Sequence, residues 1–582
     1  MEIESTNNVF TNIKPENPAE EFNKRKDKIV KWFKDPYNLT FSLILILGIV
    51  LRIYYFNLTK SQPLWWDEAD YMAYAKNLAG YSTNWIVTGE HSSTFCYVVA
   101  LFFKLGLSEA VIKFCLEIIP SILLVFLTYY LIIFAYDNKK LALISSFLMA
   151  ISWNVLFTSL RFQVDIPAFF LGILSMFVFF QGYEKKQKIF GLINPKWAIT
   201  ITLFLVVLTY SVRRAYFLFG FFFLFYMLCT KPIKEILKDK YNWIGLIFSI
   251  AIFFLIEKIF FTQSILSASG TYYHPELPIT GIDLQIFGSF FKDLAGFNPL
   301  FYLFWIGLAL ITINIIFSLG YIKKLSKPEV RGDLFFLLCW VITMSYFIFY
   351  QRTEGLGDPR WYYPVLLTCF VCISRLALVI PSFVKTYSET NFKQYSKIIF
   401  YAFAIISVLL ILYGGYYQYQ HADYIIKNKI DSFNGIKQAG LVIKDISSPE
   451  DIIISIPRPQ PAYYSERQVL QPQEIYNKSI NNPQGTFEDF LNALSKPENK
   501  NVKYIIVSFS EPVSPAWIMK QSYYQDSSGQ VKVSKWEIPF MDTVIDFQNN
   551  NQDIKQLKDY DSIQFSLLSI KDECFIYKIN RK

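Results

Sequence analysis

The chain has 582 residues, of which 53% are hydrophobic and only 18% are charged. Soluble domains carry about 25% charged residues, so this composition excludes a wholly soluble protein, and it also excludes the disordered and disulfide-scaffold classes. The formal net charge of +9 is spread over separate lysine-rich loops, which argues against a nucleic-acid partner.

Apolar stretches long enough to cross a bilayer recur over the first two thirds of the chain. We expect about eleven membrane-spanning helices, at residues 40–56, 111–136, 141–157, 166–180, 197–210, 216–229, 243–261, 299–319, 334–350, 361–380 and 398–417. A polar arm at residues 1–38 precedes them. The predicted fold class is a polytopic α-helical membrane protein, with a transmembrane domain over residues 39–417 and a soluble C-terminal α/β domain over residues 418–582.

Basic residues gather in every second connection of the predicted bundle, and therefore on one side of the membrane. The N-terminal arm is rich in lysine, and so are the connections near residues 139–140, 185–196, 231–240, 323–331 and 385–397. Because basic loops stay in the cytoplasm, we expect the arm inside and, with an odd number of spans, the C-terminal domain outside. The short loops favour the plasma membrane of a prokaryote over the endoplasmic reticulum.

The first predicted external loop, residues 58–110, carries three carboxylates close together. Asp67, Glu68 and Asp70 follow two tryptophans, and Asp67 and Asp70 share a face if the segment is helical. Three acids at a membrane surface repel one another unless something uses their charge. The alternative is that they only complement the dipole of a helix N-terminus.

The acids belong to a pattern that resembles a known family. The Asp67-Glu68 pair, followed by Ala, Tyr and Ala, is similar to the signature of polyprenyl-phosphate-sugar glycosyltransferases of the GT-C superfamily. The protein O-mannosyltransferases and the lipid A aminoarabinose transferases are the relatives that it indicates. Three further segments resemble family elements in the same order, namely residues 89–93, 161–167 and 358–364.

The resemblance implies an inverting enzyme that moves a monosaccharide from a polyprenyl- or dolichyl-phosphate carrier to an acceptor hydroxyl or amine outside the cytoplasm. The acceptor would be a protein, a glycan or a lipid. Asp67 is the candidate catalytic base and Glu68 the second catalytic candidate. The carrier phosphate needs cations, and the candidates on the outer side are Arg161, Arg213, Arg214 and Arg360. Arginines that only anchor helix ends at the headgroups are the alternative.

Four more residues are additional candidates for the same site: Asp70, His91, Asp165 and Arg352. A histidine on the outer side, together with Asp67, Glu68 or Asp165, would suit a divalent metal ion. The sequence has no His-x-His spacing, so we assign no metal site and no cofactor and leave a divalent metal as an open alternative.

Other interpretations stay open beside this one. A lipid-linked glycan polymerase or ligase would share the outer arginines but not the Asp-Glu pair, and a flippase would show internal repeats. The triplet Trp65-Trp66-Asp67 continues with Glu-Ala and lies ahead of the second span. The Trp-Trp-Asp motif of oligosaccharyltransferases continues with Tyr-Gly and lies in the soluble C-terminal domain of that family, so we do not take the triplet as a match. Within the spans, Arg52 and Glu117 are expected to form an ion pair.

The soluble tail has its own pattern. Residues 451–456 and 502–508 have the pattern of buried strands, and helices are expected at residues 461–465 and 486–491. Thr486 has an acid three positions later, which is a capping pattern. We expect this domain either to position the acceptor or to act as a structural cap.

Overall fold

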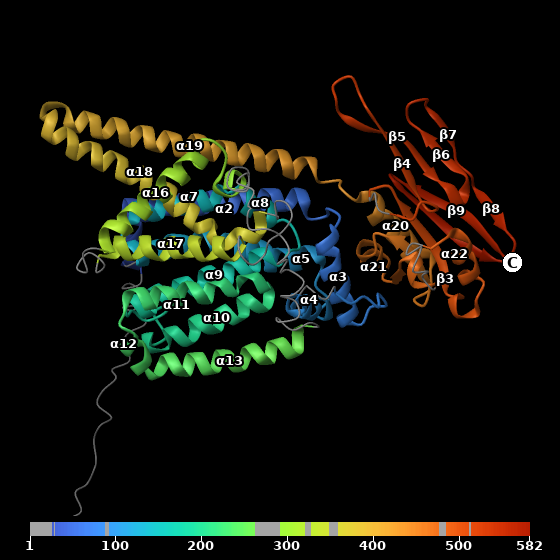
Figure 1. Cartoon of the computed structure of the whole chain (residues 1–582), viewed down its shortest axis with the longest axis horizontal. Helices are drawn as coiled ribbons and strands as arrows, with labels where there is room; N and C mark the ends of the chain where they lie inside the picture. The colour runs from blue at the N-terminus through green and yellow to red at the C-terminus, as the bar shows by residue number, and fades with distance from the viewer. Residues whose placement is uncertain are drawn as a thin grey trace, which may run out of the picture.

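The structure is a computed structural model, and it describes residues 26–27, 30–87, 92–261, 291–319, 327–347, 359–476, 485–510 and 514–582. Within these ranges eight segments are long and apolar enough to cross a membrane, which makes the chain a multi-pass membrane protein. They contain α2 (Pro36–Thr59), α6 (Ile119–Tyr136), α9 (Asp165–Val178), α10 (Ala198–Val212), α13 (Lys240–Phe260), α16 (Leu300–Leu319), α18 (Tyr363–Asn391) and α19 (Ser396–Asn428). These helices lie side by side as one bundle (Figure 1).

Three of the eleven expected spans are not among these eight. The segment at 141–157 breaks at Ser152 into α7 (Lys139–Ile151) and α8 (Trp153–Thr158). The segment at 216–229 forms α11 (Leu218–Thr230), which has only 13 residues. The third forms α17 (Pro328–Ser345), whose first two turns carry a glutamate, an arginine and an aspartate. All three still pack inside the bundle, because α7 lies against α6, and α17 against α11 and α16.

The break after α7 explains why the expected Arg52–Glu117 ion pair is wrong. Arg52 is buried on α2, and it donates hydrogen bonds to Ser121 Oγ at 2.6 Å and to the carbonyl oxygen of Ala150 at 2.9 Å. Ala150 lies in the last turn of α7, where carbonyl groups have no partner within the helix. Arg52 therefore neutralises a helix C-terminus, and Glu117 makes a different contact, described below.

The C-terminal domain is richer in strands than the sequence predicted. A six-stranded sheet has the order β2-β1-β3-β10-β9-β8, and a four-stranded antiparallel sheet has the order β4-β5-β6-β7. In the larger sheet β2, β1 and β3 are parallel and the other pairs are antiparallel. The strands are β1 (Ile452–Ile456), β2 (Gln468–Leu470), β3 (Val502–Ser508), β4 (Lys520–Gln525), β5 (Val531–Ile538), β6 (Thr543–Asp546), β7 (Asn551–Asp553), β8 (Leu557–Tyr560), β9 (Ile563–Lys571) and β10 (Cys574–Arg581).

The helices of this domain agree with the sequence analysis. The predicted helices are α21 (Pro459–Ser465) and α22 (Phe487–Leu494), and Thr486 and Asp489 form the predicted capping box at the start of α22. A further helix, α20 (Asn434–Ile446), follows α19 and packs on α21.

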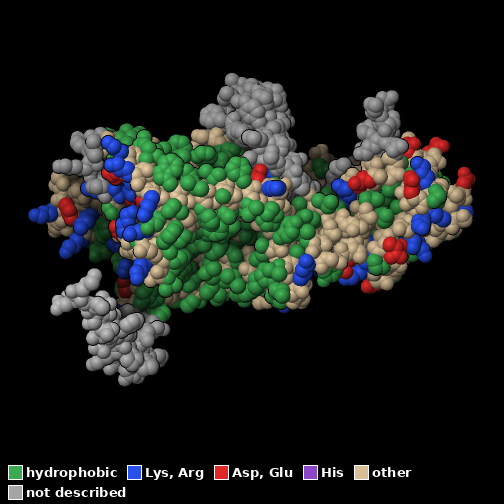
Figure 2. Space-filling view, turned by 90° about the horizontal axis from the view of Figure 1, so that it is seen from below, with side chains coloured by type: hydrophobic (Ala, Val, Ile, Leu, Met, Phe, Trp, Pro, Cys, Tyr) green, Lys and Arg blue, Asp and Glu red, His purple; other side chains and the backbone are tan. Residues whose placement is uncertain are grey.

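The loop after the first span joins the bundle to the C-terminal domain. It forms α3 (Trp66–Ala79), α4 (Thr94–Lys104) and α5 (Glu109–Lys113), which lie between the two parts (Figure 1). Leu64 and Met72 of the loop share one buried apolar cluster with Ala462 and Ile576 of the C-terminal domain. Apolar side chains cover the bundle, and basic ones gather at its far end, away from that domain (Figure 2). The loop is thus packed between two folded parts.

The crossing of α16 and α18 gives a test of the bundle packing. A Cβ atom at Gly307 would overlap the carbonyl group of Cys372, whereas one at Gly220 would meet only a methyl group of Val206 at 3.5 Å. Gly307→Ala should lower the free energy of unfolding by about 1–3 kcal/mol, because the two backbones must separate. Gly220→Ala is the control, and thermal unfolding in detergent is the measurement. Equal melting temperatures for the two variants would contradict this packing.

Candidate functional site

Two neighbouring acids begin α3 and point in different directions. Asp67 has 48% of its side chain exposed, whereas the side chain of Glu68 is 1% exposed. Consecutive residues on a helix are about 100° apart, so one acid can face water while the next faces the interior. Asp67 is therefore the accessible carboxylate of the pair.

Glu68 is neutralised by a buried arginine. Arg161 Nε donates to Glu68 Oε1, and the guanidinium of Arg161 lies on the ring of Trp65, with Cζ 3.6 Å from a ring centroid. Burial lowers the pKa of Arg161 below its ordinary value, and the charge of Glu68 acts in the opposite direction. The pair ties the start of α3 to the segment between α8 and α9.

That segment also presents Asp165 to two further arginines. Asp165 Oδ1 lies 2.5 Å from Arg213 Nη1, and Asp165 Oδ2 lies 3.8 Å from Arg360 Nη1. The other terminal nitrogen of Arg360, Nη2, lies 3.9 Å from Asp67 Oδ2. Arg360 thus stands between two carboxylates, and its 3.9 Å separation from Asp67 is longer than a direct hydrogen bond.

The arginines are held by short turns at the ends of spans. Arg213 follows α10, and Arg360 lies in a single 3₁₀ turn, Pro359–Tyr362, before α18. Tyr216 Oη donates to the carbonyl oxygen of Arg360 at 3.2 Å, which joins the two turns. Burial acts to lower the pKa of Arg213, but the facing charge of Asp165 outweighs it, and the pKa lies above its ordinary value. Arg213 is therefore a permanent cation.

The other sequence candidates lie in different surroundings. Asp70 is buried and accepts a hydrogen bond from Trp85 Nε1 at 2.8 Å. The guanidinium of Arg214 lies over the ring of Phe261, with Cζ 4.0 Å from its centroid. His91 and Arg352 lie outside the residues that the structure describes.

The structure adds contacts that the sequence analysis missed. Glu117 lies in a π-helical turn, Phe114–Ile118, and it accepts a hydrogen bond from the backbone N–H of Gln163 at 3.2 Å. Gln163 lies between Arg161 and Asp165, so this buried acid fixes the segment that carries both. Tyr464 of the C-terminal domain contacts the start of α3. The position of Glu117 within an apolar span signalled a role for it, but nothing in the sequence near Tyr464 did.

In the part of the chain that the structure describes, the site has no cluster of side chains able to bind a metal ion. Among those residues no three His, Cys, Asp or Glu side chains form a group that could hold a metal ion. Asp67 and Asp165 face guanidinium groups instead. The described donor set does not fit a metal ion, and we derive no step through one.

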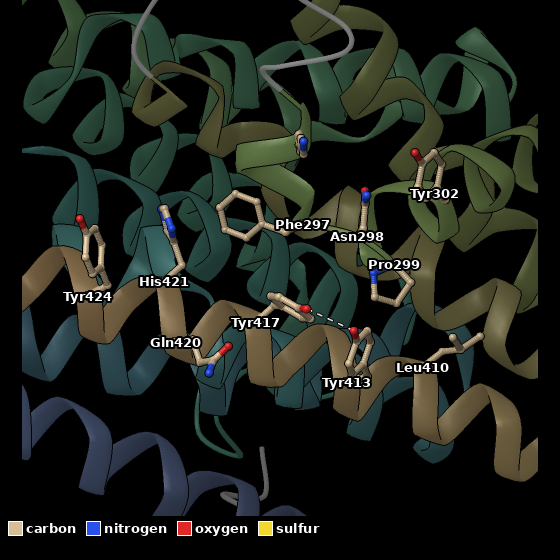
Figure 3. A pocket seen from close by; sticks show the side chains of 11 residues that line it. Phe297, Asn298, Pro299, Tyr302, Leu410, Tyr413, Tyr417, Gln420, His421 and Tyr424 are labelled. Atoms are coloured by element: carbon tan, nitrogen blue, oxygen red, sulfur yellow. Dashed lines mark hydrogen bonds between the residues drawn. The ribbon is translucent and has the colours of Figure 1, made fainter. Parts of the chain in front are cut away.

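Two of the grooves on the bundle bear on the site. One, of about 390 Å³, is lined by α10, α11 and α13 and includes Phe217, which ends the turn that begins at Arg214. The other, of about 700 Å³, lies between α19 and the start of α16 and is lined by aromatic residues (Figure 3). There His421 packs between Trp153 and Phe297, with ring centroids 4.7 and 4.5 Å away. None of the candidate site residues that the structure describes lines this second groove.

Comparison with known proteins identifies the fold. No protein-family model and no curated protein matches the chain. The apo oligosaccharyltransferase of Archaeoglobus fulgidus is 14% identical, with a TM-score of 0.56 over 88% of this chain and 76% of that chain. ArnT from Cupriavidus metallidurans, bound to undecaprenyl phosphate, is 11% identical, with a TM-score of 0.51 over 80% of this chain and 93% of that chain.

These similarities confirm the predicted fold class, a GT-C membrane fold with a soluble C-terminal domain. ArnT is an aminoarabinose transferase, one of the relatives that the sequence indicated. The oligosaccharyltransferase shares the fold too, although the position of the triplet Trp65-Trp66-Asp67 differs from that of the Trp-Trp-Asp motif of its family. The chain therefore has the fold of membrane glycosyltransferases.

The buried Glu68–Arg161 pair gives a stability test. Arg161→Leu should lower the free energy of unfolding by about 3–5 kcal/mol, because it leaves an unpaired buried carboxylate. The double variant Glu68→Gln/Arg161→Leu should recover most of that loss, since neither charge then remains. Thermal unfolding of both variants and the wild type measures this. A loss below about 1 kcal/mol in the single variant, the value of an exposed pair, would contradict the burial described here.

Proposed function

We propose that the protein is an inverting membrane glycosyltransferase that moves a monosaccharide from a polyprenyl- or dolichyl-phosphate carrier to an acceptor hydroxyl or amine on the external face. The observation that carries the proposal is the half-exposed Asp67 facing Arg360, with Asp165 and Arg213 beside it. Proteins with the same fold support it: one was solved with undecaprenyl phosphate and another with a dolichol-phosphate.

Asp67 acts as the base in this proposal. Its carboxylate takes the proton of the acceptor group as the acceptor atom attacks the anomeric carbon of the sugar. The bond between that carbon and the carrier phosphate oxygen breaks on the opposite side, so the configuration inverts. The carrier leaves as a phosphate with one more negative charge, and the glycosylated acceptor is the product.

The arginines receive the growing negative charge of the carrier phosphate. Arg360 and Arg213 have 22% and 17% of their side chains exposed, so both can reach a ligand. Guanidinium groups suit this role because each offers two parallel hydrogen bonds to phosphate oxygens. Arg214 begins the turn that ends at Phe217 in the groove between α10, α11 and α13, whose apolar walls suit the first isoprene units of the carrier. Arg161, whose side chain is 2% exposed, acts through Glu68.

The site lies at the end of the bundle next to the C-terminal domain, opposite the lysine-rich end, and we propose that this end faces outward. A prokaryotic plasma membrane and a protein, glycan or lipid acceptor complete the proposal. A polymerase or ligase and a flippase are the competing functions. A flippase would move lipid across vesicles without releasing the carrier phosphate, which separates it from a transferase in the same assay.

Removal of the proposed base tests the function. Purified protein incubated with labelled polyprenyl-phosphate sugars should release the carrier phosphate, and Asp67→Asn should slow transfer about 10²- to 10⁴-fold with donor binding retained. Asp423→Asn is the control, because Asp423 also pairs with a cation, Lys427, but is not one of the candidate site residues. Unchanged transfer by Asp67→Asn would contradict the role of Asp67.

Removal of a proposed phosphate ligand tests the other half of the site. Arg360→Gln should weaken binding of undecaprenyl phosphate about 10- to 100-fold, the loss of one or two charge-assisted hydrogen bonds. Arg458→Gln is the control, because Arg458 is similarly exposed but pairs with Glu474 on the C-terminal domain. Titration with the lipid phosphate in detergent measures the affinity. Equal affinities of the two variants would remove Arg360 from the phosphate site.

A further inference from the structure

The helix that carries the acids begins without a side-chain cap. Its N-cap residue is Trp65, which makes no capping hydrogen bond. The residue before it, Leu64, is fully buried, and its backbone N–H donates to Tyr464 Oη at 2.8 Å. A buried N–H group needs a partner, and here the C-terminal domain supplies it. The entry to α3 is therefore fixed by a side chain 400 positions further along the chain.

The other end of α3 is fixed by the same part of the C-terminal domain. Lys76 Nζ donates to Glu466 Oε1 at 2.7 Å and to the carbonyl oxygen of Tyr463 at 3.1 Å. Lys444 Nζ lies 2.8 Å from the same oxygen of Glu466. The side chains of Lys76 and Glu466 are only 11% and 14% exposed, so solvent screens this pair little.

Apolar contacts fill the space between the two ends. The helix α21 packs along α3, and its Tyr463 and Tyr464 share a buried cluster with Met72 and Ala73. The ring of Tyr463 lies under Lys76 Nζ, with the centroid 4.1 Å away, and Tyr463 Oη donates to Glu109 of α5 at 2.9 Å. The two tyrosine hydroxyls thus bind different elements: that of Tyr464 holds the start of α3, and that of Tyr463 holds α5.

From these contacts we infer that Tyr464 is a positioning residue for Asp67 and Glu68; this inference rests on the proposed function. Leu64 precedes Asp67 by three residues, and no side chain caps the helix between them. A general base must lie within hydrogen-bond reach of the proton that it removes. Because a displacement of about 1 Å can cost about 100-fold in rate, the Tyr464 hydrogen bond acts on catalysis without touching the substrate.

The test compares two adjacent tyrosines. Tyr464→Phe keeps the ring and removes the oxygen that accepts from Leu64, and we expect kcat to fall at least about 10-fold while the KM values for donor and acceptor stay within about twofold. Tyr463→Phe loses a buried hydrogen bond of the same kind but to α5, and its kcat should stay within about threefold of the wild type. Similar kcat values for the two variants would overturn the inference.

A second measurement separates this inference from the proposed function. Amide hydrogen exchange at residues 64–70 should increase in Tyr464→Phe and not in Tyr463→Phe, and it needs no catalysis. If the wild-type protein shows no transfer activity, the proposed function is wrong and the inference falls with it. The exchange data would still test the hydrogen bond between Leu64 and Tyr464. If Tyr464→Phe does not fold, Glu466→Gln tests the other end of α3: a lower kcat at unchanged KM supports the inference, and an unchanged kcat overturns it.

Discussion

Charge pairing at the end of a membrane-spanning bundle is the constraint on which the rest of this structure depends. An ionised group that leaves water is costly unless an opposite charge or a set of hydrogen bonds compensates it. Glu68 and Asp165 are both buried, and each faces an arginine from a different element. Since those arginines come from the segment after α8 and the turn after α10, pairing the charges also fixes how the helix ends meet.

The same constraint gives Asp67 and Glu68 different roles. Glu68 is buried and its charge is compensated by that of Arg161, so it can orient the helix but cannot reach a substrate. Asp67 is half-exposed and lies 3.9 Å from Arg360, too far for a full hydrogen bond. It is the carboxylate of the pair that keeps both contact with water and a nearby cation, which are the two properties that a base beside a phosphate site requires.

Sequence alone predicted the features that depend on local pattern. The apolar stretches, the acid-bearing helix, strands β1 and β3 and the Thr486 cap follow from hydropathy, periodicity and short-range spacing. The partner of Arg52 was missed, because a helix end at Ala150 offers carbonyl groups that no residue type announces. Strand β2 and strands β4 to β10 were missed as well. Of these, β4, β7 and β8 are largely exposed and lack a continuous apolar run.

The link between Tyr464 and Leu64 belongs to the class that no local pattern reveals, because it joins a phenol to a backbone group 400 residues away. It also bears on the role of the C-terminal domain. A domain that only covered the bundle could contact α3 anywhere, but this one supplies the missing N–H partner at one end of the helix and a buried carboxylate at the other. In the proposed reaction the donor arrives from the membrane and the acceptor from water. Asp67, the proposed base, lies on α3, and α3 is bound both to the bundle through Arg161 and to the C-terminal domain through Tyr464.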